Sequence, residues 1–132
     1  MARILVVDDR AVNRDLLSYL LGYFGHDVST ASDGAEAVRT ALAEPFDLIV
    51  MDIEMPGTDG YTAARLMRAE AALRDVPLIA VSAASTTTLA SAQAAGFDDF
   101  YPIPIEPRDF LARLEPLLHR RDPVGDGIRG TP

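Results

Sequence analysis

The stretch "ILVVDD" at residues 4–9 places four apolar residues directly before two adjacent carboxylates. A short apolar run of this kind is typical of a strand that is buried on both faces, as in a parallel sheet covered by helices. Two like charges at the end of a buried strand repel each other unless a cation lies between them. The stretch therefore predicts a buried strand with a specialised charged site at its end.

Four more apolar runs follow the first one, which covers residues 3–8, and each has the length of a strand. They occupy residues 27–31, 46–51, 77–82 and 98–103. Segments with helical periodicity lie between them, the clearest of which is the series Leu16, Leu17, Leu20, Leu21 and Phe24. Because parallel neighbours need crossover connections, alternating strands and helices predict a three-layer α/β sandwich with helices on both faces of the sheet.

Helix boundaries are marked by capping residues. Asp33 followed by Glu36 is a start signal for the second helix, and Gly96 is a stop signal for the fourth. Pro116 lies inside the last periodic segment, where it removes one backbone hydrogen bond. We therefore expect the last helix to kink there or to end near Glu115.

The length of 132 residues fits one folded domain, and a hydrophobic content of 48% is enough for a core of ordinary size. Residues 122–132 are rich in glycine and proline and show no periodicity. The sequence thus predicts a domain at residues 1–121 and a flexible tail at residues 122–132.

Composition excludes several classes of function. The net charge is −8 without a local basic cluster, which disfavours direct binding of nucleic acid. There is no cysteine, and His26 and His119 are far apart, so a zinc site is not expected. No apolar run could cross a membrane, and the start is too short for a signal peptide, so we expect a cytoplasmic protein.

Polar residues follow several of the predicted strands. Asp8 and Asp9 end the first strand, Asp52 follows the third, Ser82 ends the fourth and Ile103 ends the fifth. In open α/β sheets, ligands bind beyond the carboxyl ends of the strands. Each aspartate alone could be a helix cap.

Three carboxylates gathered at one edge of a sheet need a compensating cation, because two unit charges about 4 Å apart repel by roughly 4 kcal/mol at an effective dielectric of 20. Oxygen ligands of this kind predict a Mg²⁺ site. The four aspartates interpreted instead as turn or solvated residues are Asp33, Asp59, Asp98 and Asp99.

Four motifs together carry a resemblance to a known family. They are "VVDD", "IVMDIEMPGTDGY", "IAVSA" and "GFDDFYPIPI", and their order and spacing resemble the receiver domain of two-component response regulators over residues 1 to about 120. The resemblance implies a flavodoxin-like fold with a five-stranded parallel sheet in the order 2-1-3-4-5. It also implies a bacterial signalling protein, rather than a metabolic enzyme, that catalyses only its own phosphorylation and dephosphorylation.

The resemblance also assigns roles to individual residues. It implies that Asp52 is the phosphoacceptor, that Mg²⁺ is held by Asp8, Asp9, Asp52 and the backbone carbonyl of Glu54, and that the switch residues are Ser82 and Phe100. The expected phosphoryl donor is a sensor histidine kinase or a phosphotransfer protein. The resemblance further implies that a downstream protein binds the face of the fourth helix, fifth strand and fifth helix, and that the Ile103–Pro104 peptide bond is cis.

The chain departs from the family pattern at residue 103. Isoleucine stands where the family has a lysine, and the chain contains no lysine at all. One interpretation is that Mg²⁺ still drives phosphoryl transfer while phosphorylation couples less tightly to the surface change, since one contact of ~1.5 to 3 kcal/mol is missing. Alternatively, Arg10 supplies the positive charge, or the domain is a docking module that acts without phosphorylation.

We favour a single-domain response regulator that is phosphorylated on Asp52 and signals by protein contact, as a monomer or weak dimer. The alternative is an atypical receiver that serves as a phosphorylation-independent adaptor. A Mg²⁺-dependent phosphatase with an aspartyl nucleophile is disfavoured, because it needs an acid two residues after the nucleophile on the first strand, and residue 10 is arginine.

Overall fold

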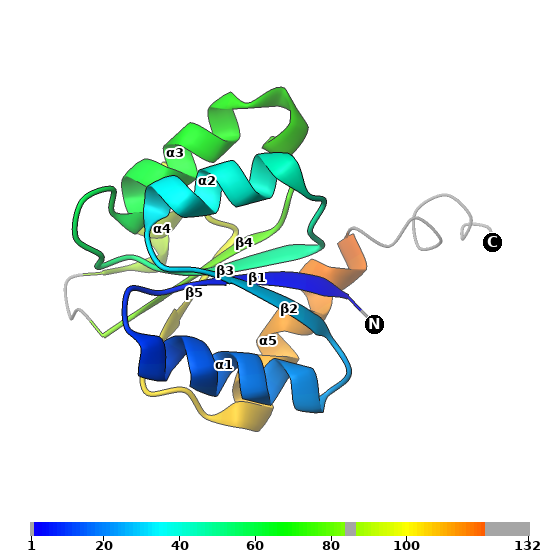
Figure 1. Ribbon diagram of the computed structural model, residues 1–132. Coiled ribbons are helices and arrows are strands. Elements are labelled where there is room, and N and C mark those ends of the chain that lie inside the picture. Colours follow the sequence, from blue (N-terminus) through cyan, green and yellow to red (C-terminus); the bar gives the residue numbers. More distant parts are fainter. Residues whose placement is uncertain (1, 84–86, 121–132) are drawn as a thin grey trace.

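Five parallel strands form one sheet at the centre of the computed structural model, which describes residues 2–83 and 87–120 (Figure 1). The strands are β1 (Arg3–Val7), β2 (Asp27–Ala31), β3 (Leu48–Asp52), β4 (Leu78–Ser82) and β5 (Asp99–Pro102). Their order in the sheet is β2-β1-β3-β4-β5. The predicted fold class and strand order are therefore confirmed.

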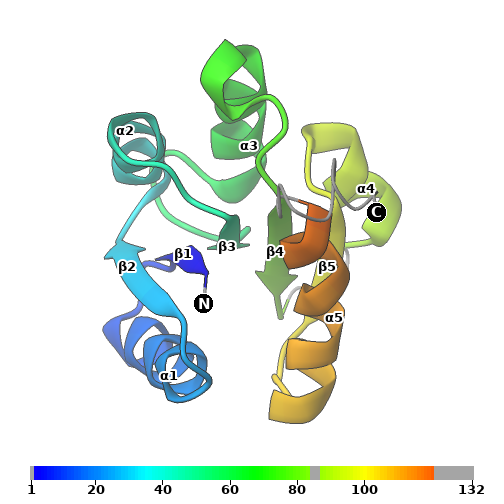
Figure 2. The same ribbon diagram turned by 90° about the vertical axis from the view of Figure 1, so that its right-hand side faces the viewer.

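Helices alternate with the strands and cover both faces of the sheet. They are α1 (Ala11–Tyr23), α2 (Gly34–Ala43), α3 (Gly60–Ala69), α4 (Leu89–Ala95) and α5 (Pro107–Arg120), with a short 3₁₀ turn, η1 (Ala71–Leu73). Helices α1 and α5 lie on one face, and α2, α3 and α4 lie on the other (Figure 2). This is the three-layer arrangement that the alternating pattern predicts.

The apolar runs are continuous because the central strands are buried on both faces. Every residue of β3 and β4 is buried, as are residues 4–7 of β1. Alternate side chains enter two separate clusters. For example, Val6 packs on the side of α1 and α5, whereas Leu5 and Val7 pack on the side of α2, α3 and α4.

The structure places the start of α2 and the end of α4 at the residues that the sequence indicated. The Asp33 carboxylate accepts a hydrogen bond from the Glu36 backbone N–H at 2.8 Å. Gly96 ends α4 with a φ of 119°, which lies in the left-handed region that favours glycine. The expected end near Glu115 is wrong, because α5 continues past Pro116 to residue 120. The buried side chains Phe110, Leu114 and Leu117 hold the helix on the sheet on both sides of the proline.

The predicted tail at residues 122–132 lies outside the described residues. Within the described ranges, none of the helices combines the length and the apolar character that crossing a membrane requires.

Candidate metal centre

Three carboxylates converge at the carboxyl ends of β1 and β3. Asp8 directly follows β1, Asp52 is the last residue of β3, and these neighbouring strands are in register with Val7 opposite Met51. One oxygen from each of Asp8, Asp9 and Asp52 lies within 4.8 Å of the other two. Asp8 is 1% exposed and Asp52 is 3% exposed, and Asp9 is more accessible than both. The register of two strands thus forces charges together that are 44 residues apart in the sequence.

Hydrogen bonds orient the two buried carboxylates. The backbone N–H of Arg10 donates to Oδ1 of Asp8 at 2.9 Å, and the backbone N–H of Glu54 donates to Oδ1 of Asp52 at 3.1 Å. The guanidinium of Arg14 donates to the carbonyl oxygen of Asp8 at 2.7 Å. Oδ2 of Asp52 is buried and has no hydrogen-bond partner among the residues that the structure describes. A buried carboxylate oxygen of this kind needs a ligand or a proton.

Burial is the main reason that the pKa of Asp52 is raised from 3.8 to about 6. The Glu54 N–H opposes this shift, the charges of Asp8 and Asp9 add to it, and the charge of Arg10 opposes it. A site that disfavours the ionised form of its own carboxylate favours any cation that restores that form. The donor set therefore fits a hard divalent cation, which binds carboxylate oxygens.

Gly60 allows the start of α3 to approach the end of β3. Its N–H donates to the carbonyl oxygen of Ile53 at 2.9 Å. A Cβ atom at this position would lie 2.6 Å from the carbonyl oxygen of Asp52 and 2.6 Å from Cα of Ile53. Only glycine fits here without moving the backbone that presents Asp52.

Comparison with known proteins identifies the family. The family model described as "Response regulator receiver domain" matches residues 4–115. The chain belongs to the family of response regulator receiver domains. This confirms the resemblance and identifies a domain of two-component signal transduction rather than a metabolic enzyme.

Individual relatives agree with this identification. The response regulator MprA of Mycobacterium avium is 35% identical over 125 residues, which are 94% of this chain and 54% of that protein. The chain spans about half the length of the curated relatives it matches. The chemotaxis protein CheY4 of Vibrio cholerae has a TM-score of 0.82 and 29% identity, with coverage of 89% of this chain and 98% of that one.

A further solved relative bears on the metal. It is the receiver domain of a sensor histidine kinase from Pseudomonas aeruginosa, with a TM-score of 0.82, 32% identity and coverage of 89% of this chain and 97% of that one. That structure holds a magnesium ion coordinated in its active-site cleft. In the present receiver domain, the three converging carboxylates could hold such an ion.

The two predicted switch residues of the receiver domain lie on neighbouring strands. Ser82 is the last residue of β4 and is 1% exposed, and Phe100 on β5 is half-buried against the cluster under α2, α3 and α4. Phe100 is in register with Ala80, so the side chains of Phe100 and Ser82 leave the sheet on the same face. The hydroxyl of Thr87 donates to Oγ of Ser82 at 3.5 Å, a long contact that sequence reasoning did not anticipate.

Ile103 lies at the same end of the sheet as the acids. Its backbone N–H donates to the carbonyl oxygen of Ser82 at 3.0 Å, and its side chain packs against the cluster under α1 and α5. The Ile103–Pro104 peptide bond is cis. A cavity of about 190 Å³ lies between this segment and α1, with Asp8 in its wall.

The four aspartates interpreted as turn or solvated residues all have structural partners. Asp33 and Asp59 cap the starts of α2 and α3. Asp98 pairs with Arg68 at 3.1 Å and also accepts a hydrogen bond from the Leu78 N–H. Asp99 receives two hydrogen bonds from the guanidinium of Arg113, at 2.7 and 3.0 Å. The caps at Asp33 and Asp59 agree with positions at a turn before a helix. The interpretation of Asp98 and Asp99 as solvated is wrong, because each is partly buried in an ion pair with an arginine of another element.

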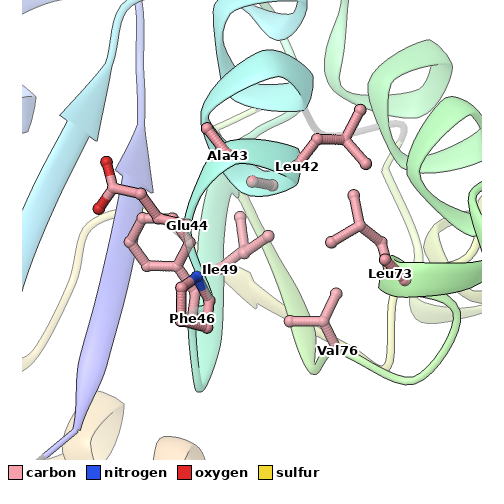
Figure 3. A pocket seen from close by; sticks show the side chains of 10 residues that line it. Leu42, Ala43, Glu44, Phe46, Ile49, Leu73 and Val76 are labelled. Atoms are coloured by element: carbon pink, nitrogen blue, oxygen red, sulfur yellow. The ribbon is translucent and has the colours of Figure 1, made fainter.

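A second cavity, of about 250 Å³, lies at the opposite end of the sheet, at the amino ends of β3 and β4 (Figure 3). Its walls near the strands are the apolar side chains of Ile49, Leu73 and Val76, with Leu42 above them. The carboxylate of Glu44 points away from these side chains and is paired with Arg3 at 2.8 Å. Glu44 is the one ionisable residue among the described residues that line this cavity.

Proposed function

We propose that this receiver domain accepts a phosphoryl group on Asp52 in a Mg²⁺-dependent reaction. The observation that carries the proposal is the buried carboxylate of Asp52, which lies within 4.8 Å of two further carboxylates and has one oxygen that no described residue hydrogen-bonds. Membership of the receiver family makes phosphoryl transfer the reaction that best fits this arrangement.

Asp8, Asp9, Asp52 and the backbone carbonyl of Glu54 would hold the magnesium ion. Its chemical contribution when bound is to neutralise negative charge on the oxygens of the transferred group. The three carboxylates of the site supply a formal charge of −3 when all are ionised, which is more than one divalent cation neutralises. This surplus favours binding of the ion and leaves Asp52 ionised, which a nucleophile must be.

The transfer itself is a displacement at phosphorus. An oxygen of Asp52 forms a bond to phosphorus while the bond from phosphorus to an imidazole nitrogen of the donor breaks, and the electron pair leaves with the imidazole. The Glu54 N–H on Oδ1 and the backbone approach at Gly60 hold the carboxylate in place. The donor would be a phosphohistidine on a sensor histidine kinase or a phosphotransfer protein, and the reaction would take place in the cytoplasm.

Ser82 and Phe100 would couple phosphorylation of Asp52 to a conformational change at the surface. The Ser82 hydroxyl would donate a hydrogen bond to a phosphoryl oxygen and give up its long contact with Thr87. Phe100, which is half-buried on the same face of the sheet, could then move inward and change the surface formed by α4, β5 and α5. A downstream protein would bind this surface, and the domain would act as a monomer or weak dimer without contacting nucleic acid itself.

The residue at position 103 affects how strongly phosphorylation is coupled to the change at the surface. An isoleucine cannot pair with Asp52 or with a phosphoryl group, so one charge-assisted contact of ~1.5 to 3 kcal/mol is absent. We expect phosphorylation to proceed because the three carboxylates remain, and we expect weaker coupling to the surface. The alternative is a docking module whose binding to partner proteins does not depend on phosphorylation.

Mass measurement separates these functions. Incubation of the chain with Mg²⁺ and acetyl phosphate should add one phosphoryl group to the intact mass, and the adduct should be absent from Asp52→Asn. Asp59→Asn is a matched control, because asparagine caps the start of α3 as well as aspartate does. An adduct that persists in Asp52→Asn would refute the assignment, and no adduct in the parent chain would support the docking function. Continuous turnover of a phosphomonoester would indicate a phosphatase.

A further inference from the structure

The cavity between α1 and the segment after β5 has apolar walls. They are formed by Leu16, Leu17, Val81, Ile103, Pro104 and Ile105. Two polar residues complete the lining, Asp8 at the end of β1 and Asn13 on α1. A volume of about 190 Å³ corresponds to roughly six water molecules at ~30 Å³ each. The cavity is therefore large enough for a short unbranched aliphatic chain.

The charge at one wall of the cavity is negative. Asp8 is 1% exposed, and one of its carboxylate oxygens lies within 4.8 Å of a carboxylate oxygen of Asp52. The chain has no lysine that could place an ammonium group in the cavity. Arg14 donates to the carbonyl oxygen of Asp8 and leaves its carboxylate to other partners. An apolar cavity that borders a buried carboxylate is complementary to a ligand with an aliphatic stem and a cationic head.

We propose that this cavity binds a primary alkylammonium ion of about four carbons, with its chain against the walls formed by Leu16 and Ile103 and its ammonium group toward Asp8. Such a ligand would place a positive charge beside Asp52, where residue 103 of this chain provides none. Binding does not depend on phosphorylation, and it is measured below without a phosphoryl donor. A negative result therefore leaves the proposed function untouched.

A chain-length series tests the proposal. The ¹³C methyl signals of Leu16, Ile103 and Ile105 are followed by NMR in EDTA while methyl-, ethyl-, propyl- and n-butylammonium chloride are added at constant ionic strength. Affinity should rise about fourfold with each methylene group that enters the cavity. The neutral analogue n-butanol should bind far more weakly than n-butylammonium. Equal affinity for the amine and the alcohol, or no dependence on chain length, would overturn the proposal.

Paired variants locate the two ends of the ligand. Asp8→Asn should abolish the preference for n-butylammonium over n-butanol, whereas Asp9→Asn should retain it, because Asp9 does not line the cavity. Leu16→Ala should reduce the gain per methylene, whereas Leu66→Ala should not. Leu16 is 62% exposed on α1, and Leu66 is 48% exposed on α3 across the sheet. Equal loss in both aspartate variants would place the ammonium in the acidic cluster instead and overturn the proposal.

A lysine side chain of a partner protein and a free alkylamine present the same chemistry. Nα-acetyl-lysine methylamide distinguishes these sources. Affinity equal to that of n-butylammonium supports the site as one for lysine side chains, whereas binding of the free amine alone supports it as one for small amines. If neither compound shifts the cavity methyl signals, the proposal fails.

Discussion

Asp52→Asn is predicted to stabilise the folded domain at neutral pH when no divalent cation is present. The raised pKa of Asp52 means that the folded protein binds a proton more tightly than the unfolded chain does. The stability associated with this proton is fully present below pH 3.8, is lost as the pH rises, and is gone once the pH is above about 6. Asparagine is neutral at every pH, so the variant does not lose this stability as the pH rises.

The size of the effect follows from the shift. Raising the pKa from 3.8 to about 6 corresponds to about 3 kcal/mol at 1.36 kcal/mol per unit, which is the upper limit for the gain at pH 7.5. The carboxamide preserves the local geometry, because its oxygen can still accept the Glu54 N–H and its NH₂ can donate to the carboxylates of Asp8 or Asp9. We expect a gain of about 1 to 3 kcal/mol.

The assay is urea unfolding in EDTA, monitored by circular dichroism at pH 3.5 and at pH 7.5. The difference in unfolding free energy between variant and parent should be near zero at pH 3.5 and clearly positive at pH 7.5. Asp59→Asn, which keeps its helix cap, should stay within about 0.5 kcal/mol of the parent at both values. Added Mg²⁺ should stabilise the parent and leave Asp52→Asn nearly unchanged. A variant that is less stable than the parent at pH 7.5 in EDTA would refute the electrostatic account of this site.

Three further predictions concern single substitutions elsewhere in the domain. Gly60→Ala should lower the unfolding free energy by about 2 kcal/mol or more and weaken Mg²⁺ binding, because the new Cβ meets the backbone at Asp52. Its control, Gly22→Ala on α1, has nothing within 4 Å of the new Cβ and should raise the unfolding free energy by about 0.5 to 1 kcal/mol in thermal unfolding. Ile103→Lys should lower the pKa of Asp52 by ~1 to 3 units in an NMR titration, and an unchanged value would show that side chains at residue 103 do not reach the acids. Arg113→Gln removes the two-pronged pair to Asp99 and should cost about 1 kcal/mol in urea unfolding, with the signals of α5 and β5 shifted most.

The sequence predicts the sheet and the acidic cluster because both depend on local patterns. Continuous apolar runs such as Ile4–Val7 identify strands that are buried on both faces, and an acid that follows such a strand must lie at the carboxyl end of the sheet. Once the strand order is known, the neighbouring positions of Asp8 and Asp52 follow from the register. No finer geometry is needed for this result, which is why it can be reached without coordinates.

Features that depend on distant partners were not predicted. Asp98 was interpreted as a solvated residue, and its partner Arg68 lies 30 residues earlier on another element. The guanidinium of Arg68 also donates to backbone carbonyl oxygens at Leu73 and Val76, so it joins α3 to the segments that precede β4 and β5. Pro116 shows the same limit, since local chemistry favours the end of a helix there and the packing of α5 on the sheet outweighs it.

The charge balance connects the acidic cluster to residue 103. Three carboxylates and one divalent cation leave a charge of −1, and a phosphoryl group on Asp52 would replace the carboxylate charge with a larger negative one of about −1.5 to −2. Arg10 is the cation whose charge acts on Asp52, and its side chain is exposed, so solvent screens much of the effect. The apolar side chain of Ile103 packs against the core and contributes no charge. The stability of the phosphorylated state of this receiver domain should therefore depend strongly on ionic strength and on added cations. The cavity lined by Asp8 is a place where such a cation could lie close to the acidic cluster.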